Sequence, residues 1–157
     1  MILAIDPGTH CGWAVMRDDD SVDSGTWDLT PRKHESAGMR YVRLVRHLDA
    51  LNDESVECIC YELVSRHAGT TAAHVYGAIV GHLQSWAAQH NTPLAAYPVT
   101  VIKKHATGKG NADKAAMIEA ARRQWPSQTI LDDNQADALA VLGCCVEALP
   151  ARKGLRS

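Results

Sequence analysis

Three things are scarce in this sequence of 157 residues: phenylalanine, long apolar runs and net charge. There is no Phe, so four Trp and four Tyr supply all the aromatic side chains. No apolar run is long enough to span a membrane, and Met1 leads directly into a core strand, so we expect a cytoplasmic protein without a membrane partner. The net charge of -2 excludes an overall basic protein, although a local basic patch can still bind phosphates.

The composition is that of one globular domain. Hydrophobic residues make up 46% of the chain and charged residues 22%, and the length is sufficient for a sizeable core. No internal repeat, low-complexity tract or linker divides the chain. We therefore expect a single domain over residues 1–150, followed by a basic tail over residues 151–157.

The cysteines are odd in number and lack the two-residue spacing of zinc ligands. They lie at Cys11, in a Cys-x-Cys pair at Cys58 and Cys60, and in an adjacent pair at Cys144 and Cys145. Most of them fall in or beside apolar segments of the chain. We predict reduced, mostly buried thiols, as is usual in the cytosol.

The order of apolar segments predicts an α/β fold. Residues 2–6 form a short apolar run bounded by turn residues, which is typical of a buried strand. Short turns join it to two further strands in an antiparallel meander. The other predicted elements are strands over 12–17, 22–29, 56–62 and 93–99, and helices over 34–51, 71–90, a short stretch after Thr100, 111–125 and 133–149. This order implies a five-stranded mixed sheet with helices on both faces.

Acidic side chains recur at the ends of these predicted elements. Asp6 ends the first strand, Glu62 ends the fourth, and Asp133 and Asp137 lie four residues apart on one face of the last helix. Strand ends of an α/β sheet converge on one edge, and grouped carboxylates need cations to neutralise them. Oxygen ligands select Mg²⁺ or Mn²⁺, and two such ions can activate a water for phosphodiester cleavage. Taken singly, each carboxylate also fits a turn, an exposed strand end or a helix N-terminus.

A glycine-rich basic segment, "TGKGNADK", precedes the next predicted helix. Its glycines let the backbone approach a phosphate, and the N–H groups of a helix start capped by Asn111 point at the same place. Lys114 lies one turn into this helix, where it can offset charge on a scissile phosphate. Lys103, Lys104 and Lys109 are expected to bind DNA, although lysines here also fit a solvated surface loop.

Four segments, in this order and at these separations, resemble the signatures of the RuvC family of Holliday-junction resolvases. They are "ILAIDPGTHCGWAV", "CICYELV", "TGKGNADK" and "DDNQADALAV". The resemblance covers nearly the whole chain, and the compact length is similar to that of phage-type members. It implies a ribonuclease-H-like fold, a homodimer, and cleavage of branched DNA, such as four-way junctions, with a divalent metal. Mg²⁺ is the expected ion, with Mn²⁺ as a substitute, in a protein encoded by a bacterial cell or its phage.

By position, the resemblance makes Asp6 the bridging metal ligand, Glu62 the second ligand, and Asp137 the carboxylate of the closing helix. The family has Asp or His three residues before this last carboxylate, where the chain has Asn134. Asn134 can offer a carbonyl oxygen, or Asp133 beside it can take the role. We expect Asp133 in preference to Asn134.

The resemblance also assigns roles to two lysines and a helix. Lys103 and Lys114 match the two lysines that the family places near the site, which makes Lys114 a catalytic group. The predicted helix over 71–90 corresponds to the family's dimer interface, and its small residues fit close approach of a second helix.

The loop after Glu62 departs from the family. There the family carries an aromatic wedge that helps to open the junction, whereas this chain has Ser65, followed by Arg66 and His67. Arg planes and His rings can contact phosphates or stack on a base, so we expect both residues to bind DNA. An ordinary polar loop is the alternative.

Three other functions fit parts of the pattern. An actin-fold phosphotransferase has a similar first loop but duplicates the fold, for which this chain is too short. A non-catalytic relative that only binds nucleic acid would explain Asn134, whereas Glu62 and the basic loop favour a nuclease. A phage nuclease that debranches forks and flaps is a further alternative, since the aromatic wedge is absent.

Overall fold

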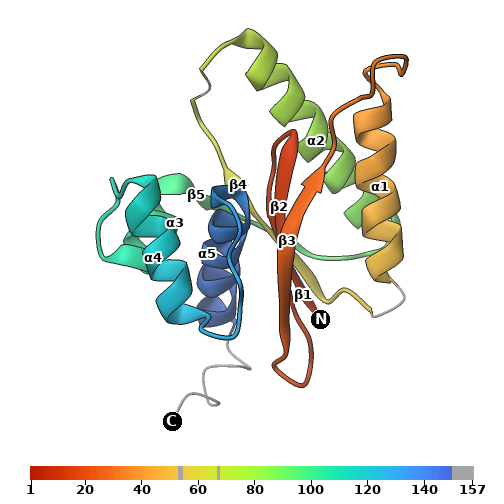
Figure 1. The fold of residues 1–157 in the computed structure, drawn as a ribbon. Coiled ribbons are helices and arrows are strands. Elements are labelled where there is room, and N and C mark those ends of the chain that lie inside the picture. The colour runs from red at the N-terminus through yellow and green to blue at the C-terminus, as the bar shows by residue number, and fades with distance from the viewer. Residues whose placement is uncertain (53–54, 67, 150–157) are drawn as a thin grey trace.

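The computed structural model describes residues 1–52, 55–66 and 68–149, so the tail predicted for 151–157 lies outside the described residues. Three strands come first, helices and strands then alternate, and α3, α4 and α5 follow the last strand, as expected for an α/β fold (Figure 1). In chain order they are β1 (Ile2–Asp6), β2 (His10–Met16), β3 (Val22–Asp28), α1 (Met39–Asn52), β4 (Cys58–Leu63), α2 (Thr70–Gln89), β5 (Leu94–Pro98), α3 (Val99–Thr107), α4 (Lys114–Gln124) and α5 (Asp133–Ala148). The α/β class is thus confirmed.

The strands form one mixed sheet in the order β3-β2-β1-β4-β5. Neighbours within the N-terminal meander, β1 with β2 and β2 with β3, are antiparallel. β4 pairs in parallel with both β1 and β5. The predicted five-stranded mixed sheet is confirmed, and β1 and β4 lie side by side at its centre.

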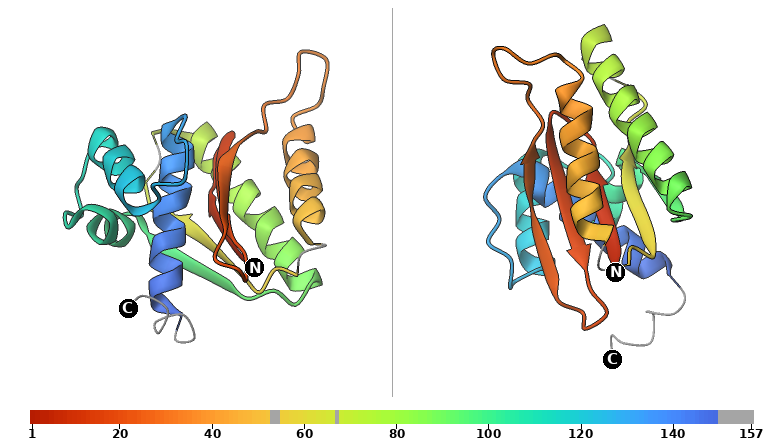
Figure 2. Two further views of the ribbon diagram at one scale, coloured as in Figure 1. Left: turned by 60° about the horizontal axis from the view of Figure 1, so that its bottom comes forward. Right: turned by 90° about the vertical axis from the view of Figure 1, so that its right-hand side faces the viewer.

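Helices cover both faces of the sheet, as Figure 2 shows: α1 and α2 lie on one face, and α5 with α3 and α4 on the other. Successive strand residues point to opposite faces. Ile2 and Ala4 of β1 therefore join the core under α5, while Leu3 and Ile5 join the core under α1 and α2. Among the described residues, no helix has both the length and the apolar character needed to cross a membrane.

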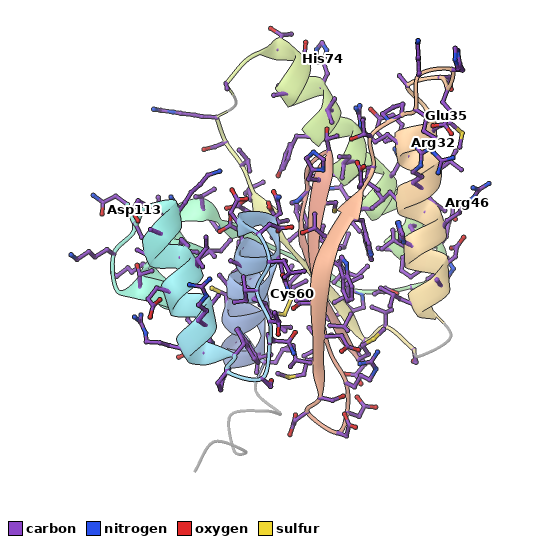
Figure 3. All side chains as sticks on the ribbon, in the orientation of Figure 1. Arg32, Glu35, Arg46, Cys60, His74 and Asp113 are labelled. Carbon is purple, nitrogen blue, oxygen red and sulfur yellow. A yellow bond between two sulfur atoms is a disulfide. The ribbon has the colours of Figure 1, made fainter. Side chains whose placement is uncertain are left out.

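The helix predicted over 34–51 begins later, at Met39. The Glu35 carboxylate accepts a hydrogen bond of 2.8 Å from the Arg32 backbone N–H and pairs with the Arg43 guanidinium. These contacts hold the preceding residues in a turn, and Figure 3 labels Arg32 and Glu35 next to the start of α1. A charged residue such as Glu35 can belong to the first turn of a helix or to a turn that precedes it. The sequence pattern did not distinguish these two possibilities.

The cap of α4 also differs from the prediction. Asp113, and not Asn111, is the N-cap: its carboxylate accepts a hydrogen bond of 2.9 Å from the Ala116 N–H. Both residue types cap helices well, and they stand two positions apart, so the pattern was ambiguous. Lys114 is consequently the first residue of α4 instead of lying one turn into it.

The prediction that all cysteines are reduced is wrong. Cys60 on β4 and Cys145 on α5 form a disulfide, whereas Cys11, Cys58 and Cys144 are free and buried. Cys60 points toward α5, which packs directly over this face of the sheet; Figure 3 labels it in that position. The two cysteines are 85 residues apart, so their contact could not be derived from local spacing.

Candidate active site

Two of the predicted carboxylates lie at the ends of neighbouring parallel strands, Asp6 as the last residue of β1 and Glu62 as the last but one of β4. Glu62 lies one step beyond Tyr61, which pairs with Ile5. Since parallel strands end at the same edge, the two side chains emerge together on the face that α5 covers. The two carboxylates interact, because the charge of Glu62 acts on Asp6.

The approach of α5 brings Asp137 to the same edge. Gly12 of β2 pairs with Asp6, and a Cβ added to Gly12 would lie only 2.0 Å from the Asn134 carbonyl oxygen and 3.3 Å from the Ala138 Cβ. Any larger residue at position 12 would push α5 away from the sheet. The sequence signal was a glycine inside a strand, which often marks close backbone approach, but its partner could not be read from it.

Polar contacts fix the start of α5 against β3. The Asp132 carboxylate caps α5 by accepting from the Gln135 N–H at 2.8 Å, and it also accepts from the Thr26 hydroxyl at 2.8 Å. The buried Gln135 amide donates to the Ser24 hydroxyl at 2.9 Å. These residues position Asp133 and Asp137, and sequence reasoning missed them because the bonds to Thr26 and Ser24 join distant parts of the chain.

The grouping of carboxylates raises the pKa values of Asp6 and Asp137. Partial burial, followed by the charges of Glu62 and Asp137, raises the pKa of Asp6 well above its ordinary value. Burial, then the charges of Glu62 and Asp133, raises the pKa of Asp137 to about 7, against the smaller opposing effect of Lys103 and of the lysine that opens α4. Carboxylates that hold protons so tightly are stabilised in their charged form by a cation.

This donor set fits a divalent cation that prefers oxygen ligands, such as Mg²⁺ or Mn²⁺. Within the described part of the chain, the only three candidate ligand atoms that lie within 4.8 Å of one another are the sulfurs of Cys58, Cys60 and Cys145. The acidic group is distinct from these sulfurs, and it is the set whose oxygens suit such ions.

Asp133 and Asn134 are placed differently at the start of α5. The Asp133 carboxylate pairs with the Lys114 ammonium, which lowers the pKa of Asp133, and its charge also acts on Asp6 and Asp137. The Asn134 backbone carbonyl faces Gly12. Asp133 thus belongs to the acidic group electrostatically.

The predicted DNA-binding residues divide into inward and outward positions. The half-buried Lys103 donates a hydrogen bond of 2.7 Å from its Nζ to the Ala112 carbonyl, so it holds the glycine-rich loop against α3. Lys104, Lys109 and Arg66 are exposed. His67, which was also predicted to bind DNA, lies outside the described residues.

Tyr76 of α2 is a further residue of the site that the sequence analysis missed. Its hydroxyl donates to the Glu62 carbonyl at 2.9 Å and accepts from the Val64 N–H at 3.0 Å. Burial raises the pKa of Tyr76, and the nearby charges of Glu62 and Asp6 add to this rise. A tyrosine in a helix otherwise rich in small residues was the available signal.

Comparison with known proteins points to a nuclease family. A sequence model described as "Crossover junction endodeoxyribonuclease RuvC" matches residues 2–145. The protein of that name from Anaeromyxobacter sp. (strain K) is 33% identical over 151 residues, which are 92% of this chain and 79% of that protein. The one from Nitratidesulfovibrio vulgaris is 28% identical, over 91% of this chain and 88% of that protein.

Solved structures share the fold. "T. thermophilus RuvC in complex with Holliday junction substrate" has a TM-score of 0.76 at 23% identity, covering 98% of this chain and 95% of that one. The fowlpox virus resolvase in complex with substrate Holliday junction DNA has a TM-score of 0.58 at 12% identity, covering 95% and 100%. The ribonuclease-H-like fold expected from the sequence is thereby confirmed.

Proposed function

This chain belongs to the RuvC family of crossover junction endodeoxyribonucleases, and we propose that it cuts Holliday junctions and related branched DNA by hydrolysing phosphodiester bonds. The family depends on divalent metal in general and serves DNA recombination and repair. Mg²⁺ is the proposed ion, with Mn²⁺ able to replace it, and the bacterial cytoplasm is the proposed place of action. The observation that carries the proposal is the grouping of Asp6, Glu62 and Asp137 at one sheet edge.

The proposed roles follow from this grouping. Asp6 interacts with both Glu62 and Asp137, which supports a bridging role for Asp6 and terminal roles for the other two. Asp133 is preferred over Asn134 as the additional ligand, because its charge acts on the rest of the group. Metal bound there would activate a water molecule and stabilise the leaving oxygen.

Lysines complement the acidic group in this proposal. Lys114 is exposed and pairs with Asp133, so a scissile phosphate could replace that carboxylate as its partner. Lys103 holds the glycine-rich loop and lowers the pKa of Asp137. The exposed Lys104 and Lys109 extend positive charge along the loop, where they would bind the DNA backbone.

A homodimer is part of the proposal, since two symmetric cuts in a four-way junction call for two sites. An apolar groove of about 370 Å³ lies between α1 and α2, lined in part by Tyr41, Val45 and His82. Val42 in the same groove is 41% exposed. At Gly77 and Gly81 of α2, an added Cβ would meet nothing within 4 Å, which leaves room for a second helix. These features support a second copy of the chain on this surface.

Broad debranching of forks and flaps is a second candidate function. It is favoured by the polar residue at position 65, where the family carries an aromatic wedge, because the chain then lacks that device for opening four-way junctions. Binding without cleavage is favoured only by Asn134, and the surrounding carboxylates argue against it.

The test is cleavage of labelled four-way, three-way, flap and linear DNA in Mg²⁺, Mn²⁺ and EDTA, with Asp6→Asn beside the wild type. Paired symmetric nicks in four-way DNA, lost in EDTA and in the variant, would support a resolvase. Equal cutting of every branched form would support the debranching nuclease, and binding without cutting in either metal would contradict both. Asp19→Asn is the matched control, because Asp19 is exposed in the turn at the opposite end of the sheet.

A further inference from the structure

A cavity of about 540 Å³ opens beside the acidic edge. Its walls come from the turn after β1, from the chain just beyond β4, and from the N-terminal parts of α1 and α2. Pro7 follows Asp6 directly, and Val64 stands two residues after Glu62, so the cavity is lined by the segments that continue from the two carboxylates. Its volume lies in the range of sites that bind small molecules or single building blocks of polymers.

Arg40 of α1 gives the cavity a positive charge. Its Nε is buried and has no hydrogen-bond partner among the described residues. A guanidinium is charged at every physiological pH and offers five donors, and a buried donor without an acceptor is destabilising. The group that best matches such a fork is a phosphate or carboxylate. Thr9 and Thr71 add hydroxyl groups to the same walls.

The remaining walls are largely apolar. Pro7, Val64, Val75 and the ring of Tyr76 line the cavity, together with Ala72. A flat apolar group with an attached anion would satisfy both kinds of wall, and a nucleotide has this chemistry. Unpaired bases are commonly held against apolar and aromatic side chains, with a cation on the backbone.

We propose that this cavity binds one unpaired nucleotide of the branched DNA, with its base against Val75 and Tyr76 and its phosphate on Arg40. The inference rests on the proposed function and adds a substrate-binding site to it. Captured nucleotides would stabilise an opened branch point. The chain thereby compensates for Ser65, which cannot insert between bases as an aromatic side chain would.

The experiment measures binding of the full chain, in EDTA, to a four-way junction with 2-aminopurine at the branch point. The fluorescence of this base changes when it leaves the stack, and anisotropy gives Kd on the same sample. The same junction with an abasic residue at that position, and a linear duplex, are the reference substrates. Two variants alter the cavity: Arg40→Ala removes its charge, and Ala72→Trp fills it from an exposed position on α2.

We expect both variants to weaken junction binding by roughly 10-fold and to abolish the fluorescence change, while duplex binding changes by less than about two-fold. Arg40→Lys should restore part of the affinity. Arg122→Ala, at an exposed position near the end of α4, is the matched control and should bind as the wild type does. For the wild type, the abasic junction should bind more weakly than the intact one.

Three results would overturn the inference in distinguishable ways. If the wild type cuts junctions in Mg²⁺ but both cavity variants keep its Kd and its fluorescence change, the nucleotide site is wrong and the proposed function stands. If the variants weaken junction and duplex binding equally, Arg40 is a general DNA contact and the nucleotide site is again wrong. A wild type that neither binds nor cuts branched DNA would overturn both proposals.

Discussion

The two faces of the sheet hold their helices in different ways. On the face that carries the acidic residues, α5 lies against the backbone of β2, at Gly12. On the opposite face, α1 and α2 rest on large side chains, which include Leu44, Leu48, Ile79, Leu83 and Trp86. A helix seated on backbone has little freedom to shift, whereas a layer of large side chains can repack around a change.

Cross-links also differ between the two faces, although Tyr76 of α2 bonds to β4. On the α5 face, the Thr26–Asp132 hydrogen bond and the Cys60–Cys145 disulfide tie the helix to the sheet at both ends. On the opposite face, the Trp86 indole donates to the Asp49 carboxylate at 2.7 Å, which ties α2 to α1 instead of to a strand. The position of the acidic residues thus depends on the α5 face, whereas the α1 and α2 face carries the cavity and the groove for which we proposed a nucleotide and a second subunit.

The largest effect is expected from Gly12→Ala, which breaks the close contact of α5. The new Cβ would overlap the Asn134 carbonyl, so α5 must move, and Asp137 moves with it. Displacement of a reacting group by about 1 Å lowers rates roughly 100-fold, and overpacking of this kind destabilises by about 3 kcal/mol. Junction cleavage and urea unfolding measure the two losses.

Leu83→Ala is the comparison variant on the opposite face. Loss of this buried side chain should lower the free energy of unfolding by about 2–5 kcal/mol, yet leave cleavage by the folded protein within about three-fold of wild type. Cleavage by Gly12→Ala at the wild-type rate would show that the position of α5 does not depend on this contact.

A smaller effect concerns pH and metal. The pKa of Asp137 is about 7 in the folded chain, above its ordinary value of 3.8, so the folded state binds this proton more tightly than the unfolded state. Its contribution to stability is complete below pH 3.8 and is lost as pH rises to about 7. Without metal, the free energy of unfolding should therefore fall by about 2 kcal/mol more in wild type than in Asp137→Asn between pH 4.5 and about 7.5.

Urea unfolding in EDTA at a series of pH values measures this difference, and added Mg²⁺ at the upper end should restore stability to wild type. Asp19→Asn provides a control of opposite sign. Hydrogen bonds from Ser21 lower the pKa of Asp19, so its contribution is lost only as pH falls below its ordinary value. Parallel pH curves for wild type and Asp137→Asn would contradict the acidic coupling at the sheet edge.

Local patterns were sufficient for the strands and for two of the carboxylates. Asp6 and Glu62 each end an apolar run, and parallel pairing of those runs follows from the element order. Contacts between distant segments were not accessible, because nothing near Gly12 specifies that Asn134 will pack on it. The Cys60–Cys145 disulfide was not predicted for the same reason, since 85 residues separate the two cysteines.

Errors at helix starts had a different cause. Glu35 and Asp113 both stand where several polar residues could begin a helix, and tertiary partners decide among them. Arg43 holds Glu35 in a turn outside α1. The strands and helices without such competition match their predicted ranges within two residues.

The smallest effect is expected from Tyr76→Phe. Tyr76 lies on α2 and bonds to the end of β4, so this variant tests whether the α1 and α2 face influences the acidic edge. The Tyr76 hydroxyl joins the Glu62 carbonyl and the Val64 N–H, and so fixes the end of β4. Removing it should lower stability by about 1 kcal/mol and reduce kcat roughly five-fold, with KM for DNA nearly unchanged because the ring stays in place. A positioning role further predicts that more Mg²⁺ is needed for half-maximal cleavage.

Tyr41→Phe is the matched control, since the Tyr41 ring stacks on His82 with 4.5 Å between centroids and would still do so. If Tyr76→Phe changes KM alone, the hydroxyl acts on DNA instead of on Glu62, and the two faces are then independent at the active site.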